Sequence, residues 1–130
     1  MTKRRNDMKL TNQDMDLYVQ SLSKISTKVT GKLAYAVAKN IRKLTSELVE
    51  YEHSKNANIE KFGEKNEQGN YFIRIDSEGF KKYIEAMEGI QYIECNVDIV
   101  KVPAEVVEKS ELNAQEMLSI DFMITEDTDE

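Results

Sequence analysis

Residues 30–62 read TGKLAYAVAKNIRKLTSELVEYEHSKNANIEKF, and this stretch decides the fold. Its apolar side chains recur at steps of three and four residues, which is the spacing of one helix face. At 100° per residue, the six residues of this apolar seam fall within roughly 80° of arc. They are Leu33, Val37, Ile41, Leu44, Leu48 and Tyr51. The pattern predicts one long helix that begins at Thr30–Gly31 and ends at Phe62, with Gly63 as its C-terminal stop.

A helix of that length is longer than a compact domain of this size needs, because at 1.5 Å per residue it extends for about 50 Å. Its apolar seam weakens after Tyr51, where Lys55, Asn56 and Asn58 interrupt it. We therefore expect the distal third of the helix to project from the domain or to pack on a second copy. The second possibility predicts a homodimer formed through the long helix.

Other elements are expected on both sides of this helix. Thr11, followed three residues later by Asp14, predicts a capped N-terminal helix. Downstream, the segments 71–75 and 93–102 have the composition of strands, and a short helix that ends near Gly89 separates them. We expect these two strands to pair on the long helix, with Met8–Leu10 as a candidate third strand at the edge. Short helices are predicted after Pro103 and Asn113.

The composition fits this arrangement. The chain has 130 residues, which suits one domain, and it is 40% hydrophobic and 32% charged. Such a charge-rich chain favours helices with one buried stripe. The predicted class is α+β and mostly helical: one long central helix packed with a shorter N-terminal helix and a small two- or three-stranded sheet. We expect a single domain over residues 1–124 and an acidic tail over residues 125–130.

Basic residues gather on the long helix. No acidic residue lies between Leu17 and Ser46, whereas this interval contains six Lys and Arg residues. Lys32, Lys39 and Lys43 fall within about 40° of one another on the helical wheel, and Arg42 is adjacent. This basic stripe is a candidate contact for phosphates or for an acidic partner. The alternative, which we favour, is a solvated lysine face that offsets the charge of the acidic tail.

Acidic residues gather at the C-terminus. From Pro103 onward the chain has nine acidic residues and one lysine. Such a surface can imitate a phosphate backbone and so block a DNA-binding protein, although a solubilising tail is the simpler interpretation. The four acidic residues of the tail are candidate partner contacts: Glu126, Asp127, Asp129 and Glu130.

The sequence offers little chemistry for an enzyme. The chain has one cysteine, Cys95, and one histidine. Most metal sites and most pairs of a nucleophile with a base need more such residues, so no metal site and no cofactor are predicted. The carboxylates are plentiful, but none lies in a context that raises a pKa for general acid catalysis. Nucleic-acid binding is not expected, because no stacking aromatics alternate with basic residues. No apolar run approaches the roughly 20 residues that span a bilayer, and no secretory signal is recognised.

Several motifs together resemble those of a known group of proteins. They are Lys32-Leu33-Ala34-Tyr35-Ala36-Val37-Ala38-Lys39, Lys61-Phe62-Gly63-Glu64-Lys65 with Gly69-Asn70, Val97-Asp98-Ile99, and Leu112 with Met117-Leu118 and Asp121-Phe122-Met123-Ile124. From Met8 to Ile124 the chain resembles small uncharacterised proteins from phages and prophages of Gram-positive bacteria. These are packing and turn residues, so the resemblance implies a viral accessory protein inside a bacterial host and assigns no role to any residue.

These observations lead to a functional hypothesis. We expect a phage-encoded, non-catalytic accessory protein that acts in the host cytoplasm by binding a protein, such as a host defence factor that it inhibits. The alternative is a chaperone or minor component in the assembly of the virion tail or head. The candidate partner-binding residues are the basic stripe and the four acidic residues of the tail.

Overall fold

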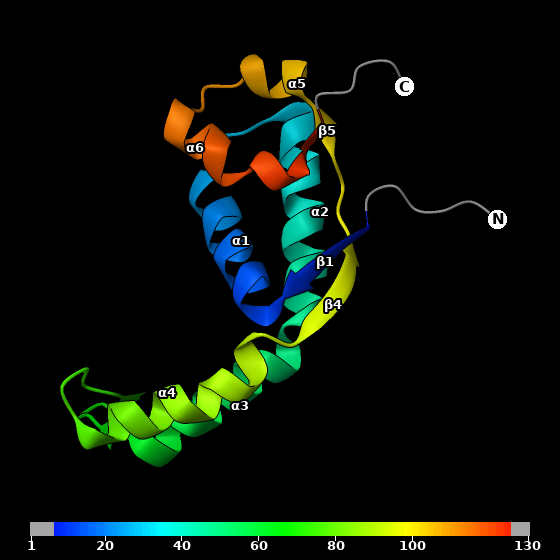
Figure 1. The fold of residues 1–130 in the computed structure, drawn as a ribbon. Coiled ribbons are helices and arrows are strands. Elements are labelled where there is room, and N and C mark those ends of the chain that lie inside the picture. Colours follow the sequence, from blue (N-terminus) through cyan, green and yellow to red (C-terminus); the bar gives the residue numbers. More distant parts are fainter. Residues whose placement is uncertain (1–6, 126–130) are drawn as a thin grey trace.

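The computed structural model describes residues 7–125, and these form an α+β fold in which helices predominate (Figure 1). The elements in chain order are β1 (Asp7–Thr11), α1 (Asn12–Ile25), α2 (Gly31–Glu47), α3 (Val49–Phe62), β2 (Glu64–Lys65), β3 (Tyr71–Phe72), α4 (Glu78–Gln91), β4 (Glu94–Asp98), β5 (Val102–Pro103), α5 (Ala104–Glu108), α6 (Ala114–Ser119), the 3₁₀ helix η1 (Asp121–Met123) and β6 (Ile124–Thr125).

The helices and strands divide into a body and an arm. In the body, α1 packs along α2, the short helices α5 and α6 cover one end, and β1 and β4 run along one side (Figure 1). The apolar seam of residues 30–62 lies in the core: Leu33, Leu44 and Leu48 are at most 2% exposed. These residues of the apolar seam are therefore part of the core.

The single long helix predicted over residues 30–62 is wrong, because the chain bends at Leu48 and forms two helices. Leu48 has φ −93° and ψ 3°, and its N–H is shared between the carbonyls of Leu44 and Thr45. One turn earlier, the Thr45 hydroxyl donates to the carbonyls of Ile41 and Arg42. Such hydroxyl bonding back to the preceding turn favours helix bending. The bend keeps Leu48 in the core while it turns α3 away from α2.

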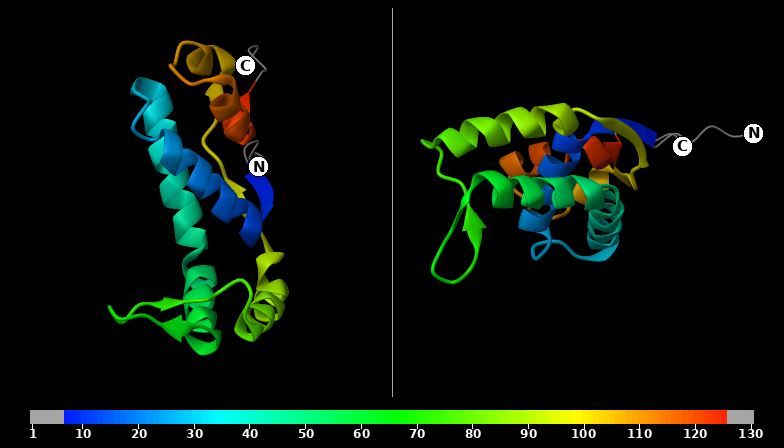
Figure 2. Two further views of the ribbon diagram at one scale, coloured as in Figure 1. Left: turned by 90° about the vertical axis from the view of Figure 1, so that its left-hand side faces the viewer. Right: turned by 90° about the horizontal axis from the view of Figure 1, so that it is seen from below.

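The arm consists of α3 and α4, which lie side by side and extend away from the body (Figures 1 and 2). Its inner end is anchored in the core by Tyr51 and Met87, which are 9% and 4% exposed. The Asn58 amide donates to the Met87 sulfur at 3.5 Å, and this contact joins the two helices. The distal part of the predicted helix thus projects, as expected, but it packs on α4 of its own chain.

The strands form three two-stranded sheets within residues 7–125. β1 pairs antiparallel with β4, from Asp7 opposite Asp98 to Thr11 opposite Glu94, so the candidate edge strand Met8–Leu10 is the principal partner. The predicted pairing of residues 71–75 with 93–102 is wrong: β3 pairs with β2 at the end of the arm. A local turn explains this hairpin, because Gly69 adopts φ 88° and the Asn66 side chain accepts the N–H groups of Gln68 and Asn70.

Helix capping follows the sequence closely. Thr11 and Asp14 form a reciprocal capping box at α1, and Asn113 and Glu116 form another at α6. Ser77 caps α4, which continues past Gly89 to Gln91. Capping depends on residues three positions apart, so these helix starts could be predicted without the tertiary fold.

Candidate functional site

The basic stripe of α2 borders an extended segment of the body, residues 98–103. Lys43 donates to the Asp98 carbonyl at 2.9 Å, and its amino group lies 3.6 Å from the Asp98 carboxylate. Lys39 lies over the ring of Tyr35, with Nζ 5.8 Å from the ring centre. Lys32 and Arg42 are exposed. The predicted lysine face is therefore partly engaged with its own chain: Lys43 is bound to Asp98, whereas Lys32 and Lys39 flank Tyr35.

A groove of about 460 Å³ lies between the first turns of α2 and the segment 100–103. Ala36, Val100, Val102 and Pro103 supply apolar side chains, and Tyr35, which is 63% exposed, stands at its edge. Its remaining lining residues are Gly31, Lys32 and Lys101. The groove therefore combines an apolar surface with cationic side chains.

Asn40 fixes the position of this groove. Its side chain is fully buried, its amide nitrogen donates to the Val100 carbonyl at 2.9 Å, and its Oδ1 accepts the Val100 N–H at 2.8 Å. This side chain binds one residue of the extended segment as a neighbouring strand would. Because the contact joins residues 60 positions apart, it holds the segment against α2.

Sequence reasoning missed Asn40, Tyr35 and Lys101 as residues of interest. A signal for Asn40 existed, since it falls within about 20° of Leu33 on the helical wheel and thus beside the apolar seam. A polar side chain at a core position usually has a hydrogen-bond partner. For Lys101 and Tyr35 there was no such signal, because the groove forms from segments that are distant in sequence.

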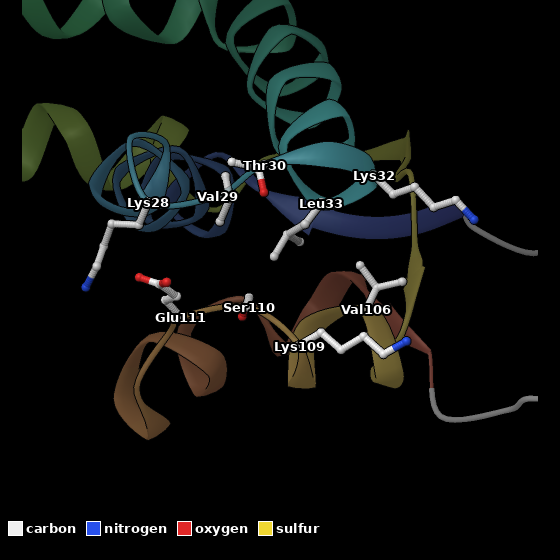
Figure 3. A pocket seen from close by; sticks show the side chains of 9 residues that line it. All are labelled: Lys28, Val29, Thr30, Lys32, Leu33, Val106, Lys109, Ser110 and Glu111. Atoms are coloured by element: carbon white, nitrogen blue, oxygen red, sulfur yellow. The ribbon is translucent and has the colours of Figure 1, made fainter.

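A second hollow, of about 480 Å³, lies between the start of α2 and the end of α5 (Figure 3). Leu33 and Val106 face each other across it, whereas the amino groups of Lys32 and Lys109 extend to one side. Lys28, at its other side, lies 2.7 Å from the Glu116 carboxylate. That hydrogen bond, together with the Asn113 N–H, lowers the pKa of Glu116. Lys28 therefore forms an ion pair with an acidic residue of its own chain.

The end of the arm exposes several large apolar side chains. Ile75 is 80% exposed, Tyr71 is 41% exposed and Phe72 is 39% exposed. All three belong to the connection between α3 and α4, and Ile84 of α4 is 43% exposed. We call Tyr71, Phe72, Ile75 and Ile84 the arm patch. Exposed apolar side chains on a projecting element are available for contact with a partner protein.

Cys95 lies in β4, with its sulfur 3.7 Å from that of Met15. Burial raises the pKa of the Cys95 thiol, and the charge and hydrogen bond of Glu47 raise it further. Less thiolate is therefore present at a given pH. Cys95 is partly buried and packs as a small apolar side chain.

We expect iodoacetamide to alkylate Cys95 more slowly than a cysteine in an unstructured peptide at pH 8, because the thiolate is the reactive form. The rate should continue to rise with pH beyond the usual thiol range. Glu47→Gln should increase the rate severalfold, whereas Glu50→Gln, at an exposed position in α3, should leave it unchanged. Mass spectrometry of timed samples measures the alkylation rate of the peptide, of the native chain and of each variant. Equal rates for the folded protein and the peptide would contradict the raised pKa.

Comparison of the chain with known protein families, with curated proteins and with solved structures gave no match. Within residues 7–125, no three His, Cys, Asp or Glu side chains are grouped so that they could hold a metal ion. Among the described helices, none has the length and apolar character to span a membrane. The predicted acidic contacts Glu126, Asp127, Asp129 and Glu130 lie outside the described residues.

Proposed function

We propose that this chain is a phage-encoded accessory protein that acts without catalysis, by binding another protein in the cytoplasm of its bacterial host. The arm patch carries the proposal. It consists of large exposed apolar side chains on a projecting pair of helices and on the connection between them, where a partner can reach them without disturbing the core. The resemblance of residues 8–124 to small phage and prophage proteins supports the viral origin.

The proposed partner is a host defence factor whose activity the bound protein inhibits. Removal of apolar surface from water drives most protein association, and exposed aromatic side chains are enriched at interfaces. Tyr71 and Phe72 provide such side chains, and Ile75 follows them in the same connection between α3 and α4. The small size of the chain is sufficient for a protein that acts by covering part of its target.

An affinity-tagged chain, expressed in a phage-susceptible host, tests this function. We expect a host protein to co-purify in stoichiometric amount, and Ile75→Asp to reduce its recovery at least tenfold. Because Ile75 is 80% exposed, this substitution should leave the fold intact. Leu118→Asp is the matched control, since Leu118 is an exposed apolar residue of α6 in the body, and it should leave recovery unchanged. Recovery that does not depend on Ile75 would contradict the role of the arm patch.

The second candidate is a chaperone or minor component in assembly of the virion tail or head. The arm also favours this function, because a projecting helical pair can insert between phage subunits. Tagging the protein during infection separates the two: a capsid or tail protein would co-purify in this case, and a host protein in the first. A gene position between capsid and tail genes would likewise favour assembly.

A further inference from the structure

The groove between α2 and residues 100–103 is a second surface, distinct from the arm patch. Its floor is apolar, and Tyr35 at its edge is 63% exposed. An exposed tyrosine beside an apolar floor supplies a large contact area at low conformational cost, which is typical of a peptide-binding surface.

The charges around the groove have one sign. Lys32 and Lys101 line it, and no acidic residue is among its described lining residues. Lys39 adds a third cation, 5.8 Å from the centre of the Tyr35 ring. The groove thus has two lysines in its lining and a third over its tyrosine, and the complementary ligand carries carboxylates around an apolar side chain.

The walls of the groove are held in place before any ligand binds. The buried Asn40 amide joins α2 to Val100 through two hydrogen bonds. Beyond it, Val102 and Pro103 pair in parallel with Ile124 and Thr125 of β6. A preformed surface loses little entropy on binding, so more of the contact energy appears as affinity.

We infer that this groove binds an acidic peptide segment of a partner protein, with an apolar or aromatic side chain on the floor and carboxylates against Lys32, Lys39 and Lys101. This inference rests on the proposed protein-binding function and adds the chemistry of a second contact. A peptide fits better than a nucleic acid, because the floor is apolar and three lysines neutralise few phosphates.

The test uses a short fluorescein-labelled peptide of glutamates around one phenylalanine, with fluorescence anisotropy as the readout. We expect the full chain to bind it, and binding to weaken as salt rises. The double variant Lys32→Glu/Lys101→Glu should weaken binding about tenfold or more, and Tyr35→Ala about fivefold. Lys81→Glu/Lys82→Glu changes the charge equally at exposed positions of α4, and it should leave the affinity within about twofold.

Four results would overturn the inference. They are equal binding of a peptide with glutamine in place of glutamate, no effect of the groove variants, tighter binding of a single-stranded DNA oligonucleotide than of the peptide, and a tenfold gain in affinity when residues 126–130 are removed. The last result would identify the acidic C-terminus of this chain as the occupant. Each of these measurements uses only purified protein and peptide. A negative result would therefore contradict the groove inference alone and would leave the co-purification test of the arm patch unaffected.

Discussion

Replacement of Asn40 by leucine should lower the free energy of unfolding by about 3 kcal/mol. Asn40 is 0% exposed, and its amide provides partners for both the N–H and the C=O of Val100, at 2.8 and 2.9 Å. A leucine has the same branched skeleton but no polar atoms, so it leaves both backbone groups unpaired in a poorly hydrated position. Each unpaired group costs about 1–3 kcal/mol.

A second substitution separates hydrogen bonding from packing at this position. Asn40→Asp keeps the shape but replaces the donor that serves the Val100 carbonyl with a buried carboxylate. Burial raises the pKa of a carboxyl group, so the variant should be least stable at neutral pH. As the pH falls and the carboxyl gains a proton, the variant should recover stability relative to the native chain.

Denaturation in urea, followed by circular dichroism, measures these effects. Asn56→Leu is the control, because Asn56 is an exposed asparagine of the helix α3. The control should change the free energy of unfolding by less than about 0.5 kcal/mol. A loss below about 1 kcal/mol for Asn40→Leu would show that water or another group satisfies Val100.

The second large effect is expected in the arm, for Gly79→Ala. A Cβ atom at Gly79 would clash with the carbonyl oxygen of Phe62, so the start of α4 and the end of α3 would have to separate. Backbone atoms at both sides leave no flexible side chain to yield. We expect a loss of about 2–3 kcal/mol, in the range of other overpacking substitutions.

Gly89 of the same helix provides the matched control. A Cβ atom there meets no described atom within 4 Å, and alanine is favoured over glycine inside a helix. Gly89→Ala should therefore raise the free energy of unfolding by about 0.5–1 kcal/mol. Hydrogen exchange should show faster exchange in the outer part of α3 and α4 for Gly79→Ala, with the body unchanged. Equal behaviour of the two variants would contradict the close approach at Phe62.

Features that depend on neighbouring residues could be predicted from the sequence. The capping boxes at Thr11 and Asn113 and the apolar seam from Leu33 to Tyr51 all follow from local spacing, and the structure contains them. The bend at Leu48 could not be predicted in this way, because a continuous helix and a bent one give the same spacing of apolar residues. The bend is stabilised by the Thr45 hydroxyl and by the packing of α3 on α4.

Features that depend on distant residues were predicted less well. β2 and β3 have two residues each, and a pairing so short follows from the turn at Gly69 more than from strand composition. The groove likewise needs Tyr35 and Lys101 to be adjacent, which the Asn40–Val100 contact brings about. The sequence predicted the basic stripe as a candidate contact surface, but it did not predict the apolar floor next to it, because residues from two distant segments form that floor.

Because the chain bends at Leu48, the direction in which α3 leaves the body depends on the backbone at this residue. A helix of 14 residues is about 21 Å long at 1.5 Å per residue, so a rotation of about 10° at its base displaces the far end by about 4 Å. The backbone torsions at Leu48 therefore determine where the outermost side chains of the arm lie. Because Tyr51 and Met87 anchor the inner end of the arm in the core, the packing around these two residues limits any such rotation.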